Sequence, residues 1–112
     1  MSKLSITILD FKPLHRNTLQ GFATIRINEM RLTIKDVAIH VKGDSRWAQL
    51  PSKPMIDRDG AVIRDRETGK IAYANIFEFT DRATRDAFSH AVIAALIDSF
   101  PRALTVEMEG VT

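Results

Sequence analysis

One stretch of the chain carries apolar residues that change parity, and this change limits the folds that the chain can form. These residues are Leu32, Ile34, Val37, Ile39 and Val41. The first two are even-numbered and the last three are odd-numbered. Successive side chains of a strand point to opposite faces, so both sets can lie on one face only if the strand contains an extra residue. We therefore predict a β-bulge near Lys35 and Asp36.

Four segments have the composition or the alternation of strands, and residues that favour turns separate them. They cover residues 4–11, 19–28, 31–42 and 46–50. Lys12 and Pro13 are expected to end the first strand, and Gly43 with Asp44 forms the last turn. This order predicts an antiparallel β-meander whose third strand is bulged.

A charged and turn-rich stretch follows, with turn signals at Asp59-Gly60 and Thr68-Gly69. Residues 61–64 and 71–79 could pair between those signals. We predict a β-hairpin arm over about residues 54–75.

A long helix over residues 81–100 is the clearest element of the C-terminal half. Thr80 is the expected N-cap, Asp81 suits the first turn, and Pro101 ends the helix. An apolar stripe at helical spacing is expected to lie on the sheet. Its members are Ala87, Phe88, Ala91, Val92, Ala95, Leu96 and Phe100.

Three further apolar residues of this helix, Ile93, Ala94 and Ile97, lie outside the stripe. A helix on one sheet needs an apolar face of only about 100°, so we predict that these residues form the interface of a homodimer. Alternatively, the tail over residues 103–112 covers them. That tail could also form a short strand over residues 104–108 or be a loose end.

The chain of 112 residues suits a single α+β domain over residues 1–102. It contains no Cys, which excludes disulfides and zinc sites built on Cys. The longest apolar run, residues 91–97, is far too short to cross a membrane, and the first ten residues lack a signal-peptide core. We expect a cytoplasmic protein without membrane contact.

Charge is distributed unevenly along the chain. Residues 1–56 hold nine Lys or Arg and four acids, whereas residues 57–112 hold seven and ten. The basic first half favours contact with nucleic acid. The overall charge of +2, however, fits an ordinary surface of mixed charge equally well.

The sheet face opposite the helix is expected to combine cations with aromatic rings. Its predicted members are Phe22, Arg26, Lys35, His40, Lys42 and Trp47. Proteins that bind single strands use cations along the backbone and rings that stack on bases. The alternative is that Phe22 and Trp47 fill a dimer interface, where aromatic residues are also frequent.

Further cations occur on the predicted arm and at the start of the helix. Lys53, Arg58, Arg64 and Arg66 alternate with acids, which suits either a solvated loop or a phosphate clamp. Arg85 could bind a phosphate near the helix start or pair with a neighbouring acid.

No set of residues with catalytic spacing stands out, so we expect no enzyme and no cofactor. The three histidines, His15, His40 and His90, lack the spacing of metal ligands. The segment Asp57-x-Asp59-Gly60 does not match a calcium loop, because the first and last ligand positions would fall on Met55 and Arg66. We therefore predict no metal site.

The third strand with its Gly43 turn, then Pro51-Ser52-Lys53 and Asp59-Gly60, resembles the SpoVG (stage V sporulation protein G) family. The sequence Ala83-Thr84-Arg85 lies where that family tends to carry Ser-Thr-Arg. The resemblance covers residues 4–100 and implies a small bacterial, dimeric, nucleic-acid-binding regulator. Pro54 stands where a basic residue is expected, and the segment before the helix is longer.

The sequence thus predicts a DNA-binding or RNA-binding regulator that contacts single-stranded or duplex nucleic acid. The residues predicted to bind are Arg26, Lys35, Lys42, Trp47, Lys53, Arg64 and Arg85. A protein-interaction module on the same fold is the alternative, and a small-molecule binder with a pocket between helix and sheet is a third possibility.

Overall fold

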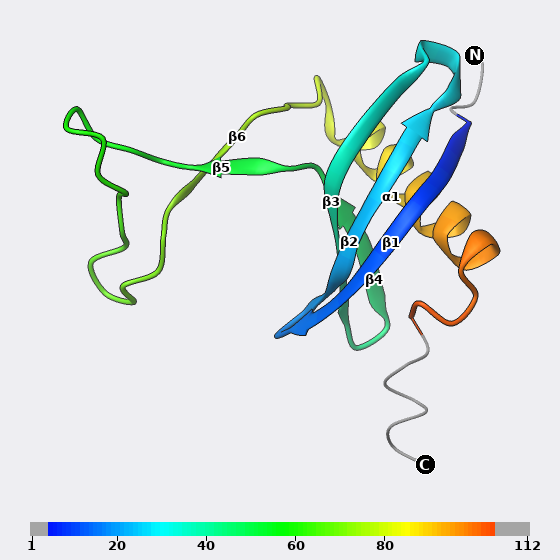
Figure 1. The fold of residues 1–112 in the computed structure, drawn as a ribbon, viewed down its shortest axis with the longest axis horizontal. Helices are drawn as coiled ribbons and strands as arrows, with labels where there is room; N and C mark the ends of the chain where they lie inside the picture. The colour runs from blue at the N-terminus through cyan, green and yellow to red at the C-terminus, as the bar shows by residue number, and fades with distance from the viewer. Residues whose placement is uncertain (1–4, 105–112) are drawn as a thin grey trace.

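Four antiparallel strands and one helix form the body of the protein, in a computed structural model that describes residues 5–104. The strands are ordered β1-β2-β3-β4, and helix α1 lies on one face of their sheet (Figure 1). Their bounds are β1 (Ile6–Arg16), β2 (Leu19–Ile27), β3 (Leu32–Lys42), β4 (Ser45–Gln49) and α1 (Arg82–Ser99), with a 3-10 turn η1 (Asn28–Met30) before β3. The predicted α+β meander is confirmed.

The predicted bulge in β3 is present. Ala23 of β2 pairs with Val37, and Ile25 pairs with Ile34, so β3 contains one residue more than β2 between these pairs. Asp36 lies there with a φ of 60°. Asp enters this left-handed region more readily than most residues with a Cβ atom. As a result, Ile34 and Val37 are both buried in the core under α1.

A second bulge, in β1, lies across β2 from the first. Between Ile8 and Asp10, β1 contains one residue more than β2, and Asp10 pairs with Thr24. The extra residue, Leu9, is exposed, whereas Ile8 and Phe11 are buried. Both neighbours of β2 therefore shift register at the level of Thr24.

Strand β1 continues to Arg16, so the prediction that Lys12 and Pro13 end it is wrong. A proline is tolerated here because β1 is an edge strand, where a missing N–H costs no pairing. Pro13 pairs with Gly21. A Cβ atom on Gly21 would overlap the backbone carbonyl oxygen of Lys12 and lie 2.7 Å from Cζ of Phe11, so this close approach requires glycine.

Helix α1 begins one residue later than predicted. Its N-cap is Asp81 and not Thr80, because the Asp81 carboxylate accepts a hydrogen bond of 2.7 Å from the backbone N–H of Thr84. This bond lowers the pKa of Asp81. Phe100 is the C-cap, immediately before Pro101.

The helix buries a wider face than the sequence predicts. Ile93 is only 8% exposed and belongs to the core beside Val92 and Leu96, so placing it outside the buried stripe was wrong. Ala87, which was predicted in the stripe, is exposed. Of the three residues predicted for a dimer interface, only Ala94 and Ile97 reach the surface.

The wide buried face follows from the diagonal course of α1 over the sheet. Close to the middle of α1, Oγ of Ser89 accepts a hydrogen bond of 2.8 Å from the backbone N–H of Ala48 in β4. Near its end, the ring of Phe100 lies 6.4 Å from that of Phe11 in β1. Crossing from one edge strand to the other brings residues on both sides of the predicted stripe into contact with the sheet.

The predicted arm projects sideways from the sheet, beyond the end of β4 (Figure 1). At its base, β5 (Ser52–Pro54) pairs with β6 (Tyr73–Asn75). The predicted pairing of residues 61–64 with 71–79 is reduced to one bridge, between Arg64 and Ile71. Residues 53–70 are all exposed. The tail strand predicted over residues 104–108 lies outside the described residues, except for Leu104, which is in a turn.

The left-handed conformation at Asp36 leads to a stability prediction. Asp36→Val should lower the free energy of unfolding by about 1 to 2 kcal/mol, because a β-branched residue is strained at positive φ. Asp36→Gly should leave the free energy unchanged or raise it slightly. Urea denaturation of both variants measures the difference, and equal stabilities would contradict the bulge.

Candidate nucleic-acid interface

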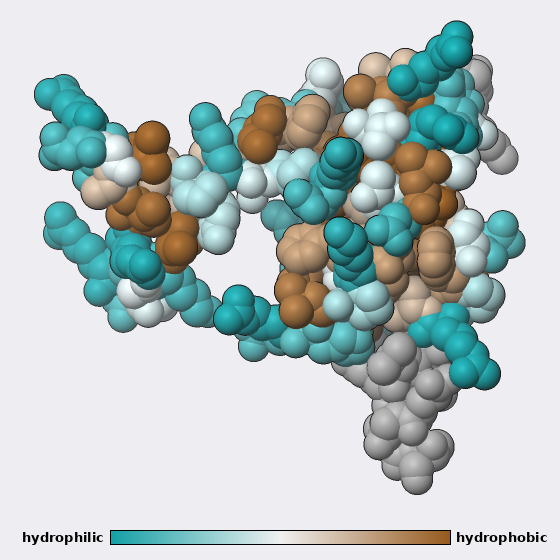
Figure 2. All heavy atoms as spheres, viewed as in Figure 1, coloured by the Kyte–Doolittle hydropathy of each residue, from teal (hydrophilic) through white to brown (hydrophobic). Residues whose placement is uncertain are grey.

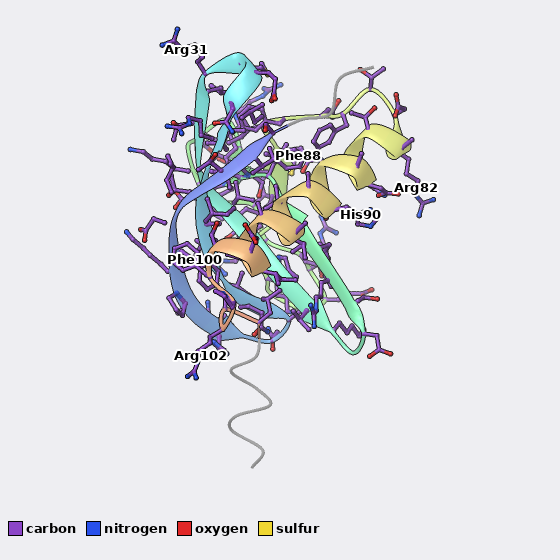
Figure 3. The ribbon with its side chains drawn as sticks, turned by 90° about the vertical axis from the view of Figure 1, so that its right-hand side faces the viewer. Arg31, Arg82, Phe88, His90, Phe100 and Arg102 are labelled. Carbon is purple, nitrogen blue, oxygen red and sulfur yellow. The ribbon has the colours of Figure 1, made fainter. Side chains whose placement is uncertain are left out.

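The face of the sheet opposite α1 carries no covering element among the described residues, and we call it the outer sheet face. The pairing register arranges its side chains in rows across the strands. Lys12, Phe22, Ala38 and Gln49 form one row over all four strands. Leu19, His40 and Trp47 form the next. In the side view of Figure 3, α1 lies on the other side of the sheet.

Two aromatic side chains of this face stack on each other. The imidazole of His40 and the indole of Trp47 have centroids 5.2 Å apart and planes only 9° from parallel. Nδ1 of His40 lies 2.9 Å from Oγ1 of Thr18, which holds the imidazole in place. Phe22 lies diagonally next to His40. It pairs with Ala38, which comes two residues before His40 in β3 and points to the same face. The predicted aromatic group therefore does lie on one surface.

The environment of His40 favours the neutral imidazole. Partial burial lowers the pKa of His40, and a weaker opposing effect comes from its hydrogen bond with the side chain of Gln49. Burial acts in this direction because it removes solvation from the charged form. The neutral imidazole is therefore favoured, and His40 contributes to this face as a stacked ring.

Four cations share the outer sheet face with the aromatic group. Lys12, Lys35 and Lys42 are exposed, and Arg26 lies further along β2. Nε of Arg26 donates a hydrogen bond of 2.9 Å to Oδ1 of Asn28, which orients its guanidinium group along the sheet. The acid Asp10 shares this face, since it pairs with Thr24. Figure 2 shows hydrophilic and hydrophobic side chains interspersed over the sheet.

The seven residues predicted to bind nucleic acid do not share one surface. Arg26, Lys35, Lys42 and Trp47 lie on the outer sheet face. Lys53 and Arg64 lie on the arm, where Nη1 of Arg64 donates to the carbonyl oxygen of Gly69 over 3.0 Å and thereby closes a turn.

Arg85 is separated from the outer sheet face as well. It lies on α1, behind β4, and its guanidinium group is 3.3 Å from the carboxylate of Asp86. Both side chains are more than half exposed, so this ion pair contributes little to stability.

Sequence reasoning missed several members of the outer sheet face, among them Lys12 and Gln49. Lys12 was assigned to the end of the first strand because it precedes Pro13. The signal that could have placed it is the spacing of Ile8 and Phe11, which requires a bulge in β1 just as the parity change does in β3.

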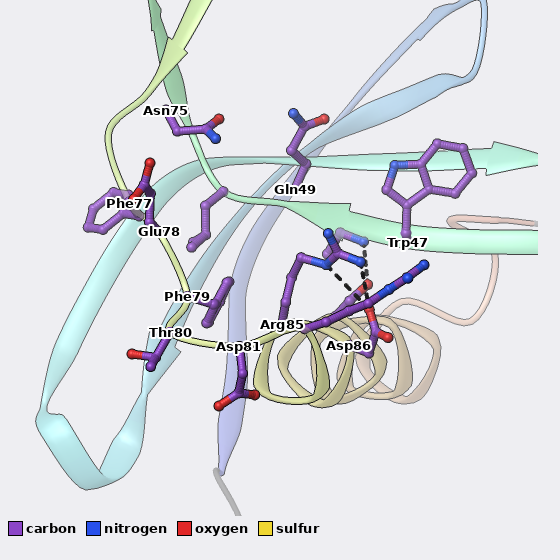
Figure 4. A pocket seen from close by; sticks show the side chains of 14 residues that line it. Trp47, Gln49, Asn75, Phe77, Glu78, Phe79, Thr80, Asp81, Arg85 and Asp86 are labelled. Atoms are coloured by element: carbon purple, nitrogen blue, oxygen red, sulfur yellow. Dashed lines mark hydrogen bonds and ion pairs between the residues drawn. The ribbon is translucent and has the colours of Figure 1, made fainter.

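A recess opens beside β4, between that strand, residues 75–81 and the first half of α1 (Figure 4). It has a volume of about 820 Å³ and is lined by Leu50 and Phe79 with charged residues such as Arg82 and Asp86. Trp47 and Gln49 point away from the helix, toward the outer sheet face. The recess thus lies between the helix and the β4 edge of the sheet.

No protein-family model, no curated protein and no solved structure matches this chain. The resemblance to the SpoVG family therefore remains a prediction from the sequence. Within residues 5–104, no group of His, Asp or Glu side chains could hold a metal ion. No helix in that range is both long enough and apolar enough to cross a membrane.

The stack of His40 on Trp47 leads to a prediction about pH. Trp47 is the only tryptophan, and a protonated imidazole in contact with an indole quenches its fluorescence. We expect the fluorescence of Trp47 to titrate with a midpoint below the usual His value of about 6.5. Folding favours the neutral form of His40. The free energy of unfolding should therefore be highest above the usual His pKa and should decrease as the pH falls through the lowered pKa.

His40→Gln is the matched control because it removes the titrating group and retains a polar side chain at this position. Its fluorescence should not change over the same range. A midpoint at or above 6.5 in the wild-type protein, or an unchanged titration in the variant, would contradict the assignment.

Proposed function

We propose that this protein is a non-enzymatic regulator that binds single-stranded nucleic acid on the outer sheet face. The observation that carries the proposal is the open group of Phe22, His40 and Trp47, with Lys12 and Lys42 beside it. An uncovered sheet that presents rings next to cations suits a strand whose bases stack while its phosphates pair with lysine.

The dimensions of the outer sheet face support a short binding site. Lys35 and Lys42 are separated by seven residues of β3, which corresponds to about 20 Å of extended chain. The aromatic group lies toward the Lys42 end, and Arg26 and Lys35 continue the positive surface toward the other end. A nucleic-acid strand that runs along β2 and β3 from the Lys42 end would contact the rings first and then Arg26 and Lys35.

Single strands are favoured over duplex by the shape of the molecule. A helix that reads the major groove needs basic residues along its exposed side. The basic residues of α1 are confined to Arg82 and Arg85 in its first turns. The residues on the outer sheet face, in contrast, can stack on unpaired bases of DNA or RNA.

The resemblance to the SpoVG family gives independent support, since it implies a small nucleic-acid-binding regulator. It rests on the bulged third strand and on Pro51-Ser52-Lys53. The bulge is the feature that places His40 and Lys42 on the same face as Phe22.

Trp47→Ala tests the proposal most simply. Loss of one stacking ring should weaken binding of a labelled single-stranded oligonucleotide by about 1 to 3 kcal/mol, or roughly 5- to 150-fold. Fluorescence anisotropy at low salt measures the affinity. Phe77→Ala is the matched control, because Phe77 is an exposed aromatic residue away from this face.

Salt dependence gives a second readout of the same site. If all four cations contact phosphates, the slope of log K against log salt should be roughly −3. Lys42→Ala should reduce its magnitude by about 0.7, whereas Arg66→Ala, on the arm, should leave it unchanged. Absence of binding at low salt, or the same decrease in the magnitude of the slope in both variants, would refute the proposal.

A protein-interaction module remains the second candidate function. The exposed apolar side chains of the arm favour it, because such surfaces commonly bind other chains. This function predicts that oligonucleotides are ignored while Trp47→Ala has no effect on any binding reaction.

A further inference from the structure

His40 lies among the rings of the outer sheet face, and histidine is the side chain whose charge most readily changes near neutral pH. The imidazole is stacked on Trp47 with planes only 9° from parallel. The same row across the sheet continues through Leu19 of β2 to Arg16 of β1. A proton gained by His40 would therefore add a positive charge next to the rings on which bases are proposed to stack.

The hydrogen bond between His40 and Thr18 suits the neutral and the charged imidazole alike. Nδ1 of His40 lies 2.9 Å from Oγ1 of Thr18. A hydroxyl group both donates and accepts, so Thr18 can donate to the neutral ring and accept from the N–H of the charged ring. Rotation of one hydroxyl hydrogen is enough to change between these arrangements. The ring can therefore take up a proton without leaving its stack on Trp47.

Gln49 is the second hydrogen-bond partner of the imidazole. Burial lowers the pKa of His40, and the hydrogen bond with the side chain of Gln49 acts in the opposite direction. That direction is expected when the amide oxygen accepts from a ring N–H, because such a bond favours the charged form. Both N–H groups of the charged ring thus have acceptors on the protein.

Three cations occupy neighbouring positions of the sheet. Lys42 follows His40 by two residues in β3, Arg16 is in the same row, and Lys12 is in the next row. Positive neighbours oppose the protonation of an imidazole. They act in the same direction as burial, so the free protein favours the neutral ring.

No carboxylate of the described residues forms an ion pair with His40. Asp10 is further along β1, where it pairs with Thr24, and Asp44 is in the turn after β3. The side chains that β2 and β4 place beside His40 are uncharged, and α1 lies on the other side of the sheet (Figure 3). Within the described part of the chain, nothing supplies the negative charge that an imidazolium ion prefers. A bound anion would supply it.

We propose that a single-stranded nucleic acid bound to the outer sheet face drives the uptake of one proton by His40. This inference rests on the proposed function and adds regulation by pH to it. Phosphate groups neutralise Lys42 and its neighbours and interact directly with the imidazolium ion, so the complex favours the charged ring. The stack on Trp47 remains favourable, because the π-system of an indole attracts a cation.

Coupling of this kind acts in both directions. If nucleic acid favours the charged ring, the charged ring favours nucleic acid by the same factor. The affinity should therefore increase as the pH falls, by about tenfold for each unit by which the pKa of His40 in the complex exceeds that in the free protein. An opposite charge close to an ionisable group typically shifts its pKa by about one unit or more, so we expect a gain of roughly tenfold.

Fluorescence anisotropy of a labelled oligothymidylate tests the coupling between about pH 5 and pH 8 at constant low salt. Thymine does not titrate in this range, so a change in affinity reports on the protein. The wild-type protein should bind roughly tenfold more tightly at the acid end. His40→Gln should bind more weakly than the wild-type protein, since it lacks the ring, and its affinity should be the same at both ends. His90→Gln is the matched control, because His90 is an exposed histidine on α1, and it should retain the wild-type profile.

Thr18 offers a second pair of variants that keep the imidazole. Thr18→Val removes the hydroxyl group that accepts from the charged ring, so the increase in affinity should move to lower pH. Thr18→Ser retains the hydroxyl group and should restore the wild-type profile. NMR signals of the imidazole C–H groups give the pKa of His40 directly, and this pKa should be higher in the complex than in the free protein.

The possible outcomes separate this inference from the proposed function. Absence of binding at every pH would refute the proposed function and the inference with it. Binding that is independent of pH, or a pH dependence that survives in His40→Gln, would overturn only the inference. A pKa of His40 that is equal in the free protein and in the complex would also overturn it.

Discussion

Thr24 lies between two bulges, and the rest of the sheet depends on this arrangement. Leu9 on one side and Asp36 on the other are the extra residues that let both neighbours of β2 shift register together. Without them, Phe11 and Val37 would point away from α1, and half of the sheet would lose its apolar face. With them, the core runs continuously under the helix, and Lys12, His40 and Lys42 are turned outward. The same local geometry thus stabilises the fold and assembles the outer sheet face.

How far each bulge could be predicted depended on the residues around it. In β3, the change from Ile34 to Val37 is visible because polar residues separate the apolar positions. In β1, Leu9 is apolar and hides the equivalent change from Ile8 to Phe11, so only the structure reveals it. Pro13 added to the error, because strand-ending proline and edge-strand proline look alike in a sequence.

The helix and the arm also have features that could not be predicted from their own sequences. Helical spacing identified Val92 and Leu96 correctly, but Ile93 is buried because α1 crosses the sheet diagonally, which no periodicity in its own sequence reveals. Turn signals located the arm, whereas its pairing joins β5 to β6 across about twenty residues. This pairing was therefore invisible in the sequence.

In the candidate site, the sequence placed the rings and most cations on one face, and it could not show that Arg85 lies behind β4.

The central claim is that the outer sheet face binds single-stranded nucleic acid. An NMR titration of isotope-labelled protein with a short single-stranded oligonucleotide tests it most directly, because each backbone amide reports its own surroundings. The account predicts that the largest shift changes cluster on alternate residues of β2, β3 and β4 around Phe22, His40 and Trp47, including the indole N–H. Changes confined to the arm or to α1, or no changes at low salt, would contradict it.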